Sequence, residues 1–193
     1  MRVGILTWFF AGNYGAKAHS FALQQYIKSL GHECEFVQYY PSNAKVLNLK
    51  MNIGRQHTKG KLIPIMKGMV RCYRFNSWNK NYSKSHLVKN AREIDDLGLD
   101  LIILGSDEVF NTIHPLFDST YYGVGILKTP CITYAPSAGQ DDCTKKLPVE
   151  LTQSLNKMKY VSARDTNTKK LLENNCNKQV AEVVDLSLIH ISE

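Results

Sequence analysis

Apolar and polar positions near the start of the chain follow the order strand, helix, strand. Arg2–Thr7 is a short apolar run that ends at turn-prone residues, which predicts a buried strand. After a break at Gly12–Gly15, apolar residues recur at helical spacing from Ala16 to Leu30 and predict a helix with Gly31 as its C-cap. Glu35–Tyr39 is then a second strand, so the chain opens with a right-handed βαβ unit. The apolar positions of the helix are Ala18, Phe21, Ala22, Tyr26 and Leu30.

The second half of the chain repeats this alternation. Asp100–Leu104 is its clearest strand and leads directly into a Gly-Ser-Asp-Glu turn. Further strands are predicted over 131–135, 160–162 and 179–184, with helices over about 146–158 and 168–174. Alternating strands and helices predict an α/β fold with a doubly wound, Rossmann-like parallel sheet and flanking helices.

The middle of the chain gives a weaker pattern. Residues 41–59 are polar and irregular, whereas Lys61–Lys80 has the spacing of an amphipathic helix with Leu62, Met66, Met69 and Tyr73 on one face. Such a helix packs on the domain core or docks on a membrane surface or a partner, and the pattern fits both interpretations.

Charge is distributed unevenly along the chain. The net charge is +7, yet Phe36–Arg92 contains twelve lysines and arginines and no acid, which leaves twelve bases against seventeen acids for the rest. The basic block over 45–92 indicates either a solvated surface or an anionic partner. Such a partner is a polyanionic saccharide, a phosphorylated lipid-linked acceptor or the inner membrane leaflet. Since no helix-turn-helix, RRM or zinc-finger signature is present, no nucleic-acid partner is expected.

Several classes of protein are disfavoured by what the sequence lacks. The longest apolar runs have the length of a strand and are far too short for a bilayer span, and no secretory signal is visible. We therefore expect a cytoplasmic protein, at the inner face of the membrane where the basic block contacts it. The five cysteines form no CxxC pair and the six histidines no HxxxH or HxH pair, so we expect reduced thiols and no metal site.

Candidate ligand-binding residues follow the predicted strands. In open parallel sheets, ligands bind outside the carboxyl ends of the strands. Asn13, Tyr14 and Gly15 follow the first strand, and Gly105, Ser106 and Asp107 follow the central one. Ser137–Gly139 and Arg164 follow the next two strands. Each motif alone also has a structural interpretation, since Asn-Tyr-Gly suits a turn and Ser-Asp suits a helix N-cap.

Taken together and in this order, the motifs resemble those of the polysaccharide pyruvyl transferase family. Arg2–Thr7, Asn13–Ala16, Ala22–Gln24 and Leu30–Glu33 resemble the opening of such proteins. Leu104–Asn111 resembles the central family motif, usually written GSDQxWN, and the segments 134–139 and 161–165 resemble the later strand ends. Two positions depart from the motif, because Glu108 stands where glutamine is usual and Phe110 where tryptophan is usual. An ionised glutamate cannot donate a hydrogen bond as a glutamine amide does, so the departure bears on substrate choice.

The resemblance implies one half of a GT-B-like two-domain enzyme with its site between the domains. It implies transfer of pyruvate from phosphoenolpyruvate to two hydroxyls of a saccharide or lipid-linked saccharide, with phosphoenolpyruvate as co-substrate and no cofactor. Cationic residues and a histidine that bind the donor are expected mainly in the second domain. The expected acceptor contacts in this chain are Asn13, Tyr14, Ser106 and Asp107. Asp107 is the expected base and Arg164 the expected anion contact, with Gly15 and Gly105 allowing close approach of the backbone.

The last eight residues, Leu186–Glu193, do not continue the family pattern. They spell the translation of a common sequencing-library adapter, so we expect the genuine sequence to stop at Asp185 and His190 to have no catalytic role. The domain organisation predicted here is therefore a Rossmann-like N-terminal domain over 1–185, an artefact over 186–193 and a second domain that is missing. Such a fragment would be inactive alone.

Two other functions stay open at the level of the sequence. A GT-B-type glycosyltransferase of similar architecture would depend on a sugar nucleotide. A non-catalytic saccharide- or anion-binding module would bind its ligand without turnover, and the affinity would fall as salt rises. The oligomeric state and the sugar acceptor do not follow from the residues.

Overall fold

The computed structural model describes residues 1–8, 14–40 and 82–184 and the single positions 70, 73, 74, 77 and 80. The irregular segment 41–59 and the terminal segment 186–193 lie outside the described residues. The helix expected over 61–80 lies largely outside them as well.

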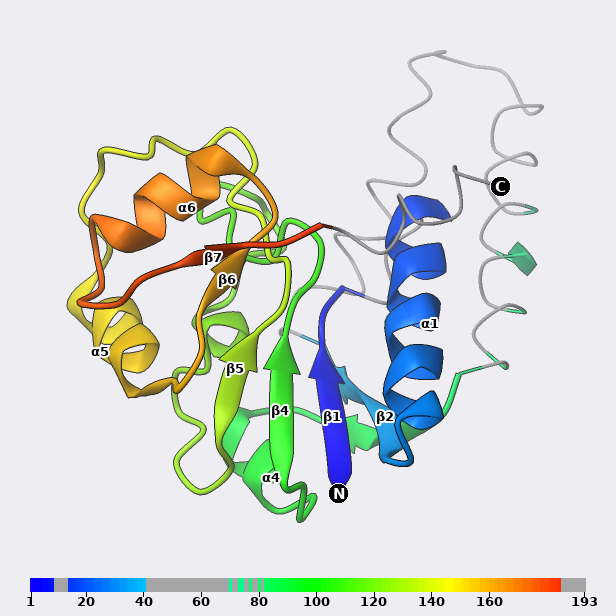
Figure 1. Cartoon of the computed structure of the whole chain (residues 1–193). Coiled ribbons are helices and arrows are strands. Elements are labelled where there is room, and N and C mark those ends of the chain that lie inside the picture. Colours follow the sequence, from blue (N-terminus) through cyan, green and yellow to red (C-terminus); the bar gives the residue numbers. More distant parts are fainter. Residues whose placement is uncertain are drawn as a thin grey trace, which may run out of the picture.

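The described chain forms an α/β fold around a five-stranded parallel sheet, as the sequence predicts (Figure 1). The strand order is β3-β2-β1-β4-β5, in which the chain moves outward from β1 to β3 and then crosses to β4 on the other side. This reversal is the Rossmann-like feature, because it brings the carboxyl ends of β1 and β4 together. The strands are β1 (Arg2–Leu6), β2 (Glu33–Tyr39), β3 (Lys84–Val88), β4 (Leu101–Leu104) and β5 (Cys131–Thr133).

Helices surround the sheet, with α1 against its β1–β2 side and α5 and α6 near β5 (Figure 1). Their bounds are α1 (Tyr14–Ser29), α4 (Ala91–Asp95), the 3₁₀ turn η2 (Ser119–Tyr122), α5 (Val149–Lys157) and α6 (Thr166–Glu173). Gly31 ends α1 as predicted, because its φ of +83° suits a left-handed cap and its N–H donates to the Lys28 carbonyl at 3.0 Å.

The buried face of α1 differs from the apolar face seen in the sequence. Tyr26 and Leu30 are both 56% exposed, so the apolar repeat that contains them does not face the core. The buried positions instead include four polar residues. Gln24 illustrates the reason, because its Nε2 donates to the carbonyls of Cys34 and Ser83 and so ties α1 to β2 and to the residue before β3. The buried positions of α1 are Ala16, Lys17, His19, Ser20, Leu23, Gln24 and Ile27.

The last two strands correct the expectation of one continuous sheet. β6 (Ser162–Ala163) and β7 (Ala181–Glu182) pair in parallel with each other and form a separate two-stranded sheet. Between β5 and β6, side-chain hydroxyls add to a backbone hydrogen bond in which the Thr133 N–H donates to the Tyr160 carbonyl at 3.3 Å. Thr133 Oγ1 donates to the Ser162 carbonyl at 2.9 Å, and Ser162 Oγ donates to the Thr133 carbonyl at 2.8 Å. We call this junction the hydroxyl seam.

β3 and α4 were not predicted from the sequence. The β3 sequence, Lys-Ser-His-Leu-Val, has no regular apolar alternation because it lies at the edge of the sheet and leaves His86 and Leu87 exposed. α4 is a short helix capped by Asn90, whose Oδ1 accepts from the Glu93 N–H at 3.0 Å. Both elements lie in the stretch that joins the two halves of the sheet.

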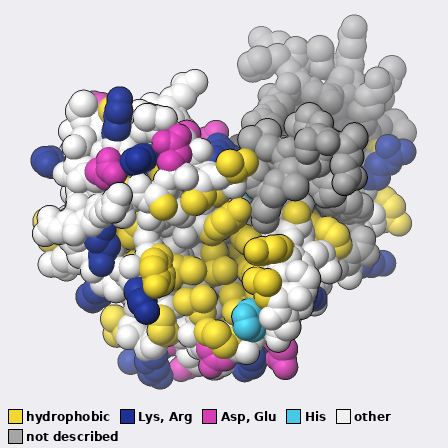
Figure 2. Space-filling view, in the orientation of Figure 1, with side chains coloured by type: hydrophobic (Ala, Val, Ile, Leu, Met, Phe, Trp, Pro, Cys, Tyr) yellow, Lys and Arg dark blue, Asp and Glu magenta, His cyan; other side chains and the backbone are white. Residues whose placement is uncertain are grey.

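Apolar side chains also gather on the open face of the sheet beside α1, over β1, β4 and β5 (Figure 2). Leu101, Ile132 and Tyr134 pack half-buried against the core, while Ile5 and Phe36 are fully buried. Among the described residues, no helix is long and apolar enough to cross a bilayer.

Candidate functional site

The candidate site begins where β4 ends, at a glycine that no other residue can replace without a collision. Gly105 has φ of +108°, and a Cβ atom built on it would lie 2.6 Å from the Tyr134 carbonyl oxygen. Its N–H donates to the Leu6 carbonyl at 3.1 Å, and the Gly105–Ser106 peptide bond is cis. Close packing of three strand ends therefore requires glycine here, whereas the sequence-based prediction for Gly105 is close approach of the backbone to a ligand.

Asp107 follows in a left-handed conformation with φ of +76°, which aspartate tolerates better than most residues. Its backbone is held from the β5 side, because the Ser137 N–H donates to the Asp107 carbonyl at 2.8 Å. Its Oδ1 accepts from the Glu108 N–H at 2.9 Å. The carboxyl group is thus fixed at the rim of the sheet and remains half-buried there.

Ser106 lies beneath this rim and contacts α1. Its Oγ is 3.3 Å from His19 Nδ1, and its carbonyl accepts from Thr7 Oγ1 at 2.7 Å. Ser106 is 1% exposed and His19 is 2% exposed. The two side chains therefore form a buried layer under Asp107, with contacts to β1 and α1.

The charges around Asp107 have opposing effects on its proton affinity. Burial raises the pKa of the Asp107 carboxyl above its ordinary value, and this effect exceeds the others. The Glu108 backbone N–H, which donates to the carboxylate, lowers that pKa. The nearby His19 and Arg164 also lower it, while the Glu108 carboxylate raises it slightly. A raised pKa suits a carboxylate that accepts a proton from a weakly acidic group.

Arg164 reaches the same rim from the end of β6. Its backbone N–H donates to the Pro136 carbonyl at 3.0 Å, which attaches the residue to the segment after β5. The next residue, Asp165, caps α6 and accepts from the Thr168 N–H at 2.8 Å and from Ser137 Oγ at 2.7 Å. A carboxyl group and a guanidinium from strand ends far apart in sequence therefore lie at one edge.

Comparison with known protein families assigns the chain that carries this edge to a family. The family model described as polysaccharide pyruvyl transferase matches residues 13–192. The chain belongs to the polysaccharide pyruvyl transferase family. No curated protein and no solved structure gave a significant match.

The two departures from the pyruvyl transferase motif lie next to Asp107. Glu108 is half-buried, and its Oε2 accepts from Asn111 Nδ2 at 3.3 Å, a bond that a glutamine oxygen would also accept. Glu108 Oε2 would lie 2.9 Å from a Cβ on Gly139, and the Gly139 φ of +60° favours glycine there. Phe110 is fully buried and stacks on Tyr122 with ring centroids 3.9 Å apart. Phe110 therefore acts through packing in this member of the family.

The other residues predicted for the pyruvyl transferase site lie at the start of α1. Asn13 is outside the described residues, and Tyr14 is the first residue of α1, with a side chain that the structure does not describe. Gly15 is exposed in the first turn. The structure brings together Gly105, Ser106, Asp107 and Arg164.

Sequence reasoning missed His19. The apolar repeat in α1 predicted the wrong buried face. His19 belongs to a second helical repeat that contains both polar and apolar residues. The spacing of Ala16, His19, Ser20 and Leu23 carries that signal, because positions three and four apart share a helix face.

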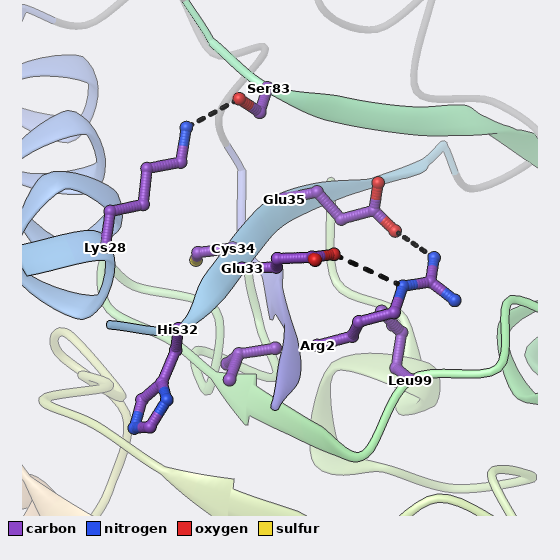
Figure 3. Close-up of a pocket in the computed structure, with 9 residues that line it drawn as sticks. Arg2, Lys28, His32, Glu33, Cys34, Glu35, Ser83 and Leu99 are labelled. Carbon is purple, nitrogen blue, oxygen red and sulfur yellow. Dashed lines mark hydrogen bonds and ion pairs between the residues drawn. The ribbon is translucent and has the colours of Figure 1, made fainter. Parts of the chain in front are cut away.

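No group of three metal-ligating side chains occurs within the described residues. A cavity of about 440 Å³ opens at the opposite edge of the sheet, beside the end of α1 that carries Lys28 (Figure 3). Its cations already have partners, since the Arg2 guanidinium lies 3.6 Å from Glu35 and Lys28 Nζ donates to Ser83 Oγ at 2.6 Å. This cavity lies at the amino ends of the strands, away from the rim that carries Asp107.

Proposed function

We propose that this protein transfers a pyruvyl group from phosphoenolpyruvate to two hydroxyls of a saccharide in the biosynthesis of a cell-surface polysaccharide. Two C–O bonds form at C2 of the donor, the C–O bond to phosphate breaks, and C3 gains a proton to become a methyl group. The products are a cyclic ketal and inorganic phosphate. Membership of the pyruvyl transferase family over residues 13–192 carries this proposal.

Asp107 acts as the base that accepts a proton from a sugar hydroxyl. Its half-buried carboxyl group at the end of β4 and its raised pKa support this role, because a stronger base accepts that proton more readily. Asn13, Tyr14 and Gly15 contact the acceptor beside it, and the buried Gly105 and Ser106 hold the turn that carries Asp107.

Arg164 contacts the carboxylate or the phosphate of the donor. A guanidinium presents paired N–H donors in a geometry that matches both groups, and its charge offsets the charge that develops on the leaving phosphate. The attachment of Arg164 to the Pro136 carbonyl supports this role, since it brings the residue to the rim that carries Asp107.

The activity test uses the intact protein encoded at the source locus, incubated with phosphoenolpyruvate and saccharide acceptors. Phosphate release together with a ketal methyl resonance in the product's NMR spectrum would support the proposal. Asp107→Asn should lower kcat by about 100-fold or more, since general bases contribute on that scale. The exposed Asp96→Asn is the matched control and should leave kcat unchanged. Dependence on a sugar nucleotide would instead indicate a glycosyltransferase, and binding without turnover a non-catalytic module.

The domain organisation has a separate test. Long-read sequencing through the Asp185 codon, without adapter insertion, should show a frame that continues into a second α/β domain with arginines and a histidine. A gene that ends at Glu193 would contradict the adapter interpretation and favour a binding module.

We also propose that the protein works in the cytoplasm, with the basic block over 45–92 against the inner membrane surface. Lys89 and Arg92 are exposed members of this block. Vesicles of anionic phospholipid should co-sediment the protein at low salt and release it at high salt, because exposed charges are screened. Retention on neutral vesicles at the same level would contradict the electrostatic contact.

A further inference from the structure

His19, which lies beneath Asp107, is a buried histidine without a role in the proposed reaction. His19 lies on the second turn of α1 and is 2% exposed, so it cannot contact a substrate bound at the rim. Buried imidazoles are retained in proteins when they bond to specific partners. The contacts of His19 with its neighbours therefore indicate its role.

His19 contacts the central strand through Ser106. The distance of 3.3 Å between His19 Nδ1 and Ser106 Oγ joins two residues that are 87 positions apart in sequence. The Ser106 carbonyl is held at the same time by Thr7 Oγ1 at 2.7 Å. Ser106 is thus fixed from α1 and from the residue after β1, and the next residue along the chain is Asp107.

His19 also interacts electrostatically with Asp107. The charged groups that face the Asp107 carboxyl come from three elements, namely His19 on α1, Glu108 on the turn after β4, and Arg164 after β6. His19 and Arg164 favour the ionised carboxylate, and Glu108 opposes it. Removal of His19 leaves Arg164 as the one group of these three that favours the ionised carboxylate.

We propose that His19 is a positioning residue that orients Asp107 through Ser106 and helps to keep the Asp107 carboxyl ionised when it acts as the base. This inference rests on the proposed function for its catalytic consequence. The contact between α1 and the β4 turn is a property of the fold and can be measured without turnover.

The first measurement follows the carboxyl carbon resonance of Asp107 in the whole chain against pH, assigned by its loss in Asp107→Asn. His19→Phe removes both the hydrogen bond and the imidazole, and His19→Asn keeps a polar group near Ser106 while it removes the imidazole. Both variants should titrate Asp107 at higher pH than the wild type, because a group that lowers the Asp107 pKa is gone. His86→Asn, at an exposed position on β3, should leave the titration unchanged. Thermal unfolding of each variant checks that it is folded.

The second measurement is the pH–rate profile of the intact enzyme. The rate rises with pH as Asp107 ionises, so the rising limb should move to higher pH in both variants. His19→Phe should also lower the plateau by about 100-fold through loss of alignment, and His19→Asn should recover at least tenfold of that loss.

The two measurements distinguish the possible failures. If folded His19→Asn titrates Asp107 at the wild-type pH, the link between His19 and Asp107 is wrong, whatever the activity. A uniform loss of rate with an unmoved limb contradicts it as well and assigns His19 a purely structural role. If the titration moves but the intact protein forms no ketal, the link stands and the proposed function fails.

Discussion

The hydroxyl of Ser137 donates a 2.7 Å hydrogen bond to Asp165 Oδ2 and joins the segment after β5 to the cap of α6. The same serine donates its backbone N–H to the Asp107 carbonyl at 2.8 Å. One buried residue therefore connects the backbone of Asp107 with the element that follows Arg164. Arg164 and Asp107 keep their relative positions through this connection.

Ser137→Ala should lower the free energy of unfolding by about 2 kcal/mol, because a hydrogen bond to a carboxylate is lost inside the fold. A double-mutant cycle with Asp165→Ala, measured by urea unfolding, isolates the coupling between the two side chains. Burial raises the pKa of Asp165, but hydrogen bonds from Thr168 and Ser137 outweigh it and lower that pKa below 3.8. The coupling should therefore be complete near neutral pH and fall as pH drops through the lowered pKa. Coupling that does not weaken at all as the solution is made strongly acidic would contradict this account.

Asp95 should be the most sensitive carboxylate of the scaffold. It is 8% exposed and accepts backbone N–H groups of Leu127, Lys128 and Thr129 at 2.8, 3.1 and 3.0 Å. Asp95→Asn places an NH₂ against these donors and should destabilise the fold by about 3 kcal/mol.

The contribution of Asp95 should also depend on pH. Burial raises its pKa, but the three backbone hydrogen bonds outweigh burial and lower the pKa below the ordinary 3.8. A group with a lowered pKa stabilises the fold above its unfolded pKa and loses that contribution as pH falls through the folded one. The stability difference between wild type and Asp95→Asn should shrink from pH 6 to pH 2 in urea titrations, and a constant difference would count against the proposed cause.

Two glycines with positive φ offer a matched pair. A Cβ on Gly105 would lie 2.6 Å from the Tyr134 carbonyl oxygen, whereas a Cβ on Gly31 meets nothing within 4 Å. Gly31→Ala should cost only the backbone strain of about 1 kcal/mol, and Gly105→Ala should cost about 3 kcal/mol or more because backbone must move. Thermal unfolding measures the loss of stability in each variant. Equal losses would show that backbone strain alone, without the contact to the Tyr134 carbonyl, sets the cost at both positions.

The hydroxyl seam can be tested with a substitution that conserves shape. Thr133→Val removes the hydroxyl that bonds to Ser162 and should cost about 2 kcal/mol, since buried backbone groups lose a partner. Thr152→Val on the half-buried side of α5 is the control and should change stability by about 0.5 kcal/mol or less. Amide hydrogen exchange should accelerate in β6 and β7 more than in β1 and β4, and a uniform increase would mean that the seam is not a separate boundary.

The sequence predicts the parts of the fold in which burial and periodicity agree. β1 and β4 consist of short apolar runs buried on both faces, and Gly31 marks the end of α1 by its chemistry. The position of Asp107 at the sheet edge also follows, because it comes directly after a central parallel strand.

The remaining features depend on contacts between residues far apart in the chain. His19 and Gln24 are polar residues on the buried face of α1, and their burial is compensated by partners on other strands, so no local pattern reveals it. The hydroxyl seam is not predicted for the same reason, since nothing in the local sequence shows that Thr133 and Ser162 hydrogen-bond to each other.

The hydroxyl seam separates the two sheets whose strands precede the two charged groups of the site. Asp107 follows the five-stranded sheet and Arg164 follows β6, beyond the seam. Cooperative opening units of proteins often coincide with such structural units, and side-chain hydroxyls carry much of the hydrogen bonding across this boundary. Mild denaturant should therefore separate the cation from the carboxylate while the main sheet is still intact. The capacity to bind a substrate would then disappear earlier in the unfolding sequence than the secondary structure that a circular dichroism spectrum reports.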